Sequence, residues 1–297
     1  MSELVKAVRE ALPGMEALEN EPLSSHVSFR IGGPAKLVLL PDSSEELEAL
    51  CTLLRRLGER PLILGNGTNV LPPDEGVDGT VILTKKAVAV SVDGETVRAD
   101  CGAGLTRVSS LAADAGLTGL EFAYGIPGTV GGALTMNAGA YGGEMKDVTV
   151  RTEYLDGELR RVCVEGTAHD FSYRHSRFTA SDVILRTELK LAYGDREAVK
   201  ARCRELTEKR KTSQPLEKPS AGSDFKRPKQ GYAAAIIDGC GLKGFRIGGA
   251  QVSEKHAGFV VNLGGATASD VKRLLEEVQK RVLKETGILL EPEIRML

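Results

Sequence analysis

A glycine-rich segment without charged residues, Gly125 to Gly143, is the first part of the chain that suggests chemistry. Seven of its nineteen residues are glycine. Glycine reaches positive φ easily and lets a ligand approach the backbone closely, but folding removes this freedom at an entropic cost that a bound ligand can offset. The segment therefore predicts a large ligand that is held mainly by backbone groups.

A second loop of the same kind, Gly65 to Asn69, follows the apolar run Leu62 to Leu64. Backbone N–H groups at the end of a strand, beside small hydroxyl and amide side chains, can converge on an anionic group. Two such loops, well separated along the chain, predict a dinucleotide whose two halves are held by different loops.

Polar residues stand beside glycine in four further segments where packing alone explains little. They are residues 28–34 (SFRIGGP), 173–178 (YRHSRF), 219–226 (PSAGSDFK) and 248–259 (GGAQVSEKHAGF), and the tail at 290–295 (LEPEIR) adds two carboxylates. Together they supply a guanidinium, a hydroxyl and carboxylates, which can bind an anion and move a proton.

Together with residues 125–143, these motifs occur in the same order as in the UDP-N-acetylenolpyruvoylglucosamine reductase (MurB) family, which the chain closely resembles from about His26 to its end. The long insertion with a substrate-covering tyrosine is missing, so the resemblance is to the shorter branch. It implies non-covalent FAD, NADPH as hydride donor, and reduction of an enolpyruvyl UDP-sugar during peptidoglycan precursor synthesis. The chain would then be an FAD-dependent oxidoreductase acting on a C=C bond.

The family's reaction makes clear demands on the protein. Hydride adds to the methylene carbon of an alkene conjugated to a carboxylate, so charge builds up on that carboxylate as in an enolate. This charge needs a cation or a fixed donor, and the neighbouring carbon then needs a proton.

Three residues match the family's catalytic groups. Arg174 matches the arginine that grips the carboxylate, Ser223 matches the proton donor, and Glu293 matches the active-site glutamate. Each also has an ordinary interpretation: an ion pair for Arg174, a turn or helix cap for Ser223, and a solvated strand carboxylate for Glu293. Glu291 is the nearest rival for the glutamate's role.

The resemblance assigns further residues to FAD and to the substrate. The FAD residues are Gly65, Asn66, Gly67, Thr68, Asn69, Val70, Leu71, Gly125, Ile126, Pro127, Gly128, Thr129, Gly132, Asn137, Gly139 and Ile184. Tyr173, Lys226 and His256 match substrate-side positions. Ile184 can also be read as a core residue and His256 as a structural histidine. No metal is implied, because the four histidines are scattered and no His/Cys pair has ligand spacing.

Two departures and two rival functions remain open. Asp224 stands beside Ser223 where the family often has an apolar or small residue, and Pro72-Pro73 replaces polar residues near the adenine end. One rival is a flavin oxidase or dehydrogenase for a hydroxy acid or sugar alcohol, although Gly65 to Leu71 lacks the histidine that often tethers flavin. The other is a sugar-nucleotide or flavin-binding module without turnover.

The elements that must position these residues follow from periodicity and turn signals. Ser43 and Glu46 have capping-box spacing before a helix that ends at Gly58, so residues 35–65 predict a βαβ unit. Asp93-Gly94 and Asp156-Gly157 predict hairpins of an antiparallel sheet, the second with Leu159 in its returning strand. Further helices are predicted at residues 1–14, 106–115, 196–211 and 267–286, and a strand at 288–296.

The resemblance implies an α+β chain: a two-subdomain FAD-binding fold of the vanillyl-alcohol-oxidase/PCMH type plus a C-terminal α/β substrate-binding domain. We expect FAD-binding subdomains at 1–84 and 85–197 and a substrate-binding domain at 198–297. The net charge of −2 favours neither nucleic acid nor anionic lipid, and no apolar run reaches the length of a membrane span. Five cysteines without a CxxC pair fit a reducing compartment. We therefore expect a cytoplasmic, monomeric protein with a UDP-sugar and NADPH as its partners.

Overall fold

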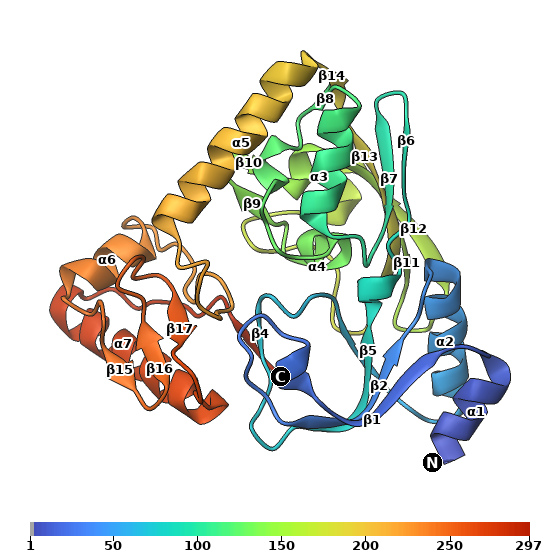
Figure 1. Cartoon of the computed structure of the whole chain (residues 1–297), viewed down its shortest axis with the longest axis horizontal. Coiled ribbons are helices and arrows are strands. Elements are labelled where there is room, and N and C mark those ends of the chain that lie inside the picture. Colours follow the sequence, from blue (N-terminus) through green and yellow to red (C-terminus); the bar gives the residue numbers. More distant parts are fainter. Residues whose placement is uncertain (1–2) are drawn as a thin grey trace. The chain divides into compact units, whose positions relative to one another are not determined.

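The computed structural model describes residues 3–297, which form two compact units (Figure 1). Unit 1 comprises the chain up to Glu19, Leu37–Asn66 and Gly79–Lys209, and unit 2 comprises Asn20–Lys36, Gly67–Asp78 and Arg210–Leu297. Each unit has its own apolar core. The three-part division at 84/85 and 197/198 stays a prediction.

A four-stranded sheet begins the fold and leads into the first glycine loop. Its strand order is β1 (Glu16–Pro22), β2 (Pro34–Leu40), β5 (Val77–Leu83) and β3 (Leu62–Leu64). The predicted strand, helix and second strand are present, but β3 pairs in parallel with β5 and not with β2. Helix α2 (Ser44–Arg56) begins where Ser43 Oγ accepts the Glu46 N–H at 3.1 Å, which confirms the predicted cap.

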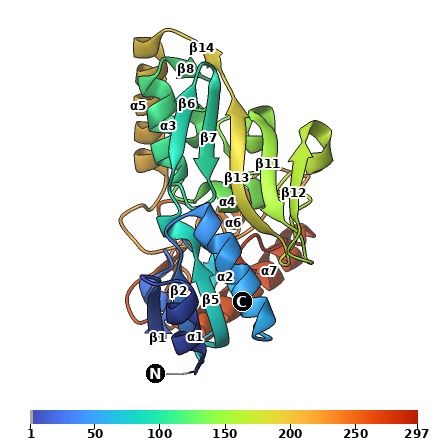
Figure 2. The ribbon, with the colours of Figure 1, turned by 90° about the vertical axis from the view of Figure 1, so that its right-hand side faces the viewer.

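The second sheet is antiparallel and carries the residues near the second glycine-rich segment (Figure 2). Its strand order is β12 (Arg161–Glu165), β11 (Thr149–Leu155), β13 (Val183–Lys190), β7 (Thr96–Asp100) and β6 (Val90–Asp93). Helices α3 (Leu105–Asp114) and α4 (Val130–Thr135) pack against it. The hairpin at Asp93-Gly94 is confirmed. The prediction for Leu159 was wrong, because this residue lies in the turn with φ of 57° and the strand begins at Arg161.

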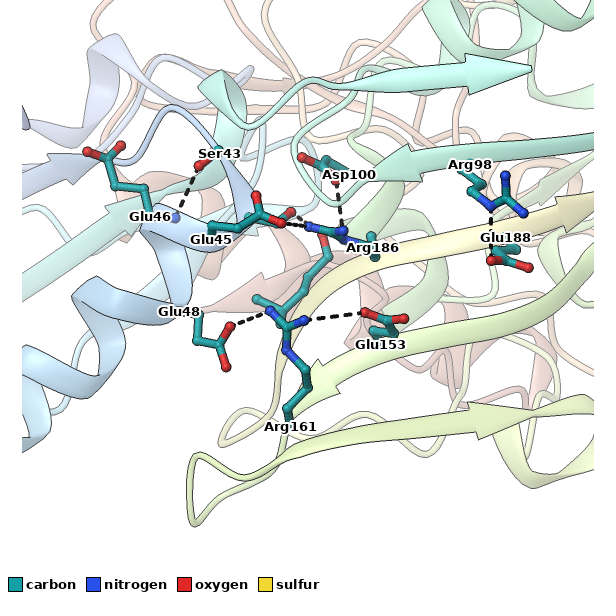
Figure 3. A network of polar contacts seen from close by, with 12 residues as sticks. Ser43, Glu45, Glu46, Glu48, Arg98, Asp100, Glu153, Arg161, Arg186 and Glu188 are labelled. Atoms are coloured by element: carbon teal, nitrogen blue, oxygen red, sulfur yellow. Dashed lines mark hydrogen bonds and ion pairs between the residues drawn. The ribbon is translucent and has the colours of Figure 1, made fainter. Parts of the chain in front are cut away.

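A network of ion pairs joins α2 to the second sheet (Figure 3). Arg186 of β13 pairs with Glu45 and lies 3.7 Å from Asp100, while Arg161 bridges Glu48 and Glu153. Beside them, the buried Ser44 hydroxyl donates to the Leu185 carbonyl at 2.7 Å. These contacts fix β13, the strand on which Ile184 lies.

In unit 2, a small sheet packs against one long helix. The sheet has the order β15 (Arg246–Ile247), β16 (Ala250–Val252) and β17 (Val260–Asn262), and the helix is α7 (Ala268–Thr286). Helix α7 confirms the prediction: Thr267 and Asp270 form a capping box at its start, and Gly287 ends it with φ of 71°. The predicted strand over 288–296 is only β18 (Arg295–Met296), because residues before it bond irregularly to other loops.

The remaining elements are short or connect the sheets. They are helices α1 (Glu3–Ala11), α5 (Arg196–Ser213) and α6 (Ala233–Gly239), and strands β4 (Val70–Leu71), β8 (Leu117–Thr118), β9 (Gly139–Ala140), β10 (Gly143–Glu144) and β14 (Ala192–Tyr193). Residues 1–2 of the predicted first helix lie outside the described residues. Across 3–297, no helix combines the length and apolarity needed to cross a bilayer.

Candidate active site

The two predicted FAD loops meet within unit 1. Strand β3 ends at Leu64, and the Asn66 side-chain amide then donates to the Pro127 carbonyl at 2.9 Å. A Cβ added at Gly65 would lie 2.2 Å from Thr129 Oγ1, so only glycine allows this approach. Thr129 is itself fixed, because its hydroxyl caps α4 at Gly132.

Helix α3 holds the start of the second loop. The Thr106 hydroxyl accepts the Gly125 N–H and donates to the Ile126 carbonyl, each at 3.1 Å, and Gly125 has φ of 89°. The two loops therefore meet through backbone groups and small, uncharged side chains. These properties fit FAD, since backbone amides and a helix start can neutralise a pyrophosphate without a lysine.

The rest of the first loop, Gly67 to Leu71, lies in unit 2 and reaches the C-terminal tail. A Cβ at Gly67 would lie 2.6 Å from Val27 Cγ1. The Asn69 amide donates to the Glu293 carbonyl at 3.2 Å, and the Arg295 N–H donates to the Asn69 carbonyl at 3.0 Å. Strands β4 and β18 continue this contact in parallel. An expected FAD residue therefore lies directly beside an expected catalytic residue.

Arg174 occupies a tight turn in unit 1. Ser172 and His175 exchange two backbone hydrogen bonds of 3.1 Å, and Arg174 adopts φ of 55° between them. A residue with a side chain is disfavoured there, and such strain is concentrated at functional sites. The guanidinium carbon lies 5.1 Å from the centre of the Tyr173 ring, which places two expected substrate-side residues together.

Asn137 ties the glycine-rich segment to this turn. Its fully buried side-chain amide donates to the Ser172 carbonyl at 3.0 Å and to Glu144 Oε2 at 2.8 Å, while its oxygen accepts the Lys146 N–H at 2.9 Å. The side chain thus serves the protein's own structure, and direct contact of Asn137 with FAD stays a prediction. Sequence reasoning missed Glu144, although its Glu-x-x-Asp spacing with Asp147 was a capping signal.

The other residues assigned to FAD in unit 1 lie on regular elements. Gly132 is in the first turn of α4, and Gly139 is in β9, where a Cβ would lie 2.6 Å from the Glu144 side chain. Ile184 is buried in β13 opposite Tyr154. Its core environment agrees with the structural interpretation, and its contact with flavin stays a prediction.

Ser223 and Glu293 lie on adjacent backbone segments of unit 2. Asp224, the residue after Ser223, donates its N–H to the Gly258 carbonyl at 2.9 Å and accepts the Glu293 N–H at 2.7 Å. The segment with Ser223 therefore runs between the segment that enters β17 and the C-terminal tail. This arrangement brings together two residues that are 70 positions apart in the sequence.

The carboxyl group of Asp224 is buried within this backbone framework. Its side chain is completely buried; Oδ2 accepts the Val260 N–H, and Oδ1 has no hydrogen-bond partner among residues 3–297. Burial, together with the nearby charge of Glu293, raises the pKa of Asp224 well above its usual value, although the Val260 hydrogen bond opposes this. Burial therefore favours the neutral form of the Asp224 carboxyl group.

Lys226 and His256 also lie in unit 2, with different surroundings. Lys226 forms an ion pair with Glu291, which is 68% exposed, so Glu291 has a surface role that the half-buried Glu293 does not share. His256 Nδ1 accepts the Gly258 N–H at 3.2 Å, and burial lowers the pKa of His256. The neutral ring thus carries its proton on Nε2.

The fold and the loops define an FAD-dependent oxidoreductase of the vanillyl-alcohol-oxidase/PCMH type. Residues 35–162 match the FAD binding domain family, and residues 214–297 match the family described as UDP-N-acetylenolpyruvoylglucosamine reductase, C-terminal domain. An alkyldihydroxyacetonephosphate synthase structure shares the fold, with a TM-score of 0.50, 17% identity, and coverage of 65% of this chain and 41% of its own.

Similarity over nearly the whole chain identifies the family. The UDP-N-acetylenolpyruvoylglucosamine reductase of Caldicellulosiruptor bescii is 46% identical over 287 residues, which cover 96% of this chain and 91% of the relative. The crystal structure of the reductase from Thermus caldophilus matches with a TM-score of 0.80 and 35% identity, over 95% of this chain and 98% of its own. The chain belongs to the UDP-N-acetylenolpyruvoylglucosamine reductase family.

Proposed function

We propose that this chain reduces UDP-N-acetylglucosamine enolpyruvate to UDP-N-acetylmuramate in peptidoglycan precursor synthesis, with NADPH as the hydride donor. The single observation that carries the proposal is the backbone contact between the Ser223 segment and Glu293, with Asp224 O accepting the Glu293 N–H at 2.7 Å. It supports a site in which the hydroxyl and the carboxylate expected from the family act on one substrate.

Each residue has a defined task in this reaction. When bound, FAD supplies the hydride-transfer chemistry between NADPH and the substrate double bond. Arg174 binds the substrate carboxylate and stabilises the negative charge that develops on it. Ser223 Oγ–H donates its proton to the carbon next to that carboxylate, so the double bond gains one hydride and one proton. Glu293 lies beside the Ser223 segment and assists this proton transfer.

The substrate-side residues support the same assignment. Lys226 and the Nε2–H of His256 provide donors suited to a diphosphate, and Tyr173 lies against the Arg174 guanidinium. A flavin oxidase for a hydroxy acid has no need for such a set. A binding module without turnover has no need for a strained arginine turn.

The decisive test separates the two half-reactions by stopped-flow absorbance of the flavin in the Ser223→Ala variant. Reduction by NADPH should stay within about twofold of wild type, because Ser223 has no part in it. Reoxidation by the enolpyruvyl sugar nucleotide should slow by roughly 10²–10⁴-fold, the usual contribution of a positioned acid.

Ser220→Ala is the matched control, because Ser220 lies in the same segment and its carbonyl, not its hydroxyl, bonds to Ser28. We expect both half-reactions of this variant to match wild type. Equal losses in both half-reactions of Ser223→Ala would contradict the proposed role and indicate a defect in folding or FAD binding. A wild-type flavin that the sugar nucleotide does not reoxidise would contradict the proposed function itself.

A further inference from the structure

One fixed carboxylate lies beside the turn that carries Arg174. Glu144 Oε2 accepts hydrogen bonds from Asn137 Nδ2 at 2.8 Å and from Lys146 Nζ at 2.9 Å. Its carboxylate also accepts the Asp147 N–H within a capping box, while the Glu144 N–H donates to Asp147 at 2.8 Å. Three donors from one short stretch of chain therefore hold this carboxylate in place.

The same buried amide connects Glu144 to the Arg174 turn. Asn137 donates to the Ser172 carbonyl as well as to Glu144, and Ser172 is two residues before Arg174. On the other side of the turn, the Ser176 hydroxyl donates to the carbonyl of Thr135, the last residue of helix α4, at 2.9 Å. The turn and the carboxylate are thus fixed to one framework, the end of the glycine-rich segment.

Electrostatics agree with this geometry. Partial burial opposes the ionisation of Glu144, but hydrogen bonds from Lys146 and Asn137 and the positive charges of Lys146 and Arg174 hold its pKa below the usual value. Glu144 is therefore ionised at neutral pH, and the Arg174 charge is near enough to contribute to that state.

We propose that Glu144 is a positioning residue that orients the Arg174 guanidinium toward the substrate carboxylate. This inference rests on the proposed function. Arg174 has a long, flexible side chain, and a guanidinium that must grip a developing enolate gains from being oriented in advance. The Tyr173 ring supports one side of the guanidinium, and the fixed Glu144 carboxylate attracts it electrostatically.

A purely structural role for Glu144 makes a different prediction. As the N-cap of the one-turn helix Met145–Asp147, Glu144 would affect the local stability of this helix and of the β9–β10 pair before it. It would then have no effect specific to the substrate. An exposed ion pair with Lys146 would contribute little in either case. The two roles differ in which half-reaction they affect and in whether rate or affinity changes.

The experiment is stopped-flow analysis of FAD-loaded Glu144→Gln. We expect flavin content and reduction by NADPH to stay within about twofold of wild type. Reoxidation at saturating sugar nucleotide should slow about tenfold. The apparent Kd of the anionic sugar nucleotide should change less than the rate or become tighter, because a negative charge near its carboxylate is removed.

Two control variants separate the effect of the Glu144 charge from the effects of the capping box and of removing a carboxylate elsewhere in the fold. Glu188→Gln neutralises a carboxylate of matched exposure, 29% against 27% for Glu144, in an ion pair with Arg98 on the five-stranded sheet (Figure 3). Asp147→Ala removes the other half of the capping box but keeps the Glu144 carboxylate. Both should reoxidise within about twofold of wild type, even if Asp147→Ala has a lower melting temperature.

Three results would overturn the positioning role: an unchanged rate in Glu144→Gln, a loss of affinity without a loss of rate, or an equal slowing in Asp147→Ala. All three leave the proposed function standing, provided that wild type completes both half-reactions. Failure of wild-type reoxidation would instead remove the proposed function.

Discussion

At the scale of single residues, the most informative positions are those that violate an ordinary preference. Arg174 has φ of 55° although it is not glycine, and Asp224 is a fully buried acid with one unpartnered oxygen. Each costs stability locally, and each lies at a segment to which the proposed function assigns a task. Asn137 bonds to the strained turn that carries Arg174, and both the amide and the oxygen of its side chain have protein partners.

The buried acid makes a prediction about pH. Burial raises the pKa of Asp224 well above its usual value in the folded protein, whereas the unfolded chain ionises this group above its ordinary pKa of about 3.9. Stability from this group is therefore fully present below about pH 4 and is lost as pH rises toward the raised folded pKa. Asp224→Asn accepts the same Val260 hydrogen bond without needing a proton, so we expect a gain of about 1–3 kcal/mol in unfolding free energy at pH 7.

Urea unfolding at pH 4 and pH 7, at a fixed FAD concentration, measures this difference. The variant and wild type should have similar midpoints at pH 4 and diverge at pH 7. A variant that is less stable than wild type at pH 7 would show that the Asp224 carboxylate is charged and stabilised in the folded state.

At the scale of elements, the site depends on two loops that approach each other closely. Strand β3 and helix α4 deliver Gly65 and Thr129 to the same point, where there is no room for a Cβ. Helix α3 holds the second loop through Thr106. The regular elements therefore set the separation of the loops, and glycine makes that separation possible.

Gly65→Ala should disrupt this contact. Its Cβ would lie 2.2 Å from Thr129 Oγ1, so the loops must move apart. We expect FAD affinity to fall at least tenfold, which is about 1.4 kcal/mol, as measured by titration of the apoprotein with FAD. Gly104→Ala is the control, because its Cβ meets nothing within 4 Å. Unchanged affinity in Gly65→Ala would mean that FAD does not depend on this approach.

At the scale of the whole molecule, the residues assigned to FAD are divided between the two units. Gly65 and Asn66 belong to unit 1, whereas Gly67 to Leu71 belong to unit 2. A ligand that binds the folded protein and not the unfolded chain stabilises the folded state by mass action.

Removal of FAD should therefore lower the thermal stability of the protein. With free FAD at 100 times its Kd, bound cofactor contributes about 2.7 kcal/mol. Calorimetry of the apoprotein and the FAD-saturated protein should show a higher unfolding midpoint with FAD. A midpoint that does not change with FAD would contradict binding of the cofactor to the folded chain.

The sequence by itself determined the elements and the family. The N-cap at Ser43, the apolar face of α7 and the order of the glycine and polar motifs are local patterns, and local patterns can be read along the chain. The turn at Leu159 and the irregular tail were predicted less well, because strand ends depend on partners that lie elsewhere.

Only the tertiary structure decided which side chains are used by the protein itself. The sequence predicts contact of Asn137 with FAD, and the structure adds that its amide bonds to Ser172, 35 residues away in sequence. The burial of Asp224 and the link from Glu144 through Asn137 to the turn that carries Arg174 likewise depend on contacts between distant segments. The physical reason is that burial and charge proximity are set by packing and strand register, which residue spacing does not specify.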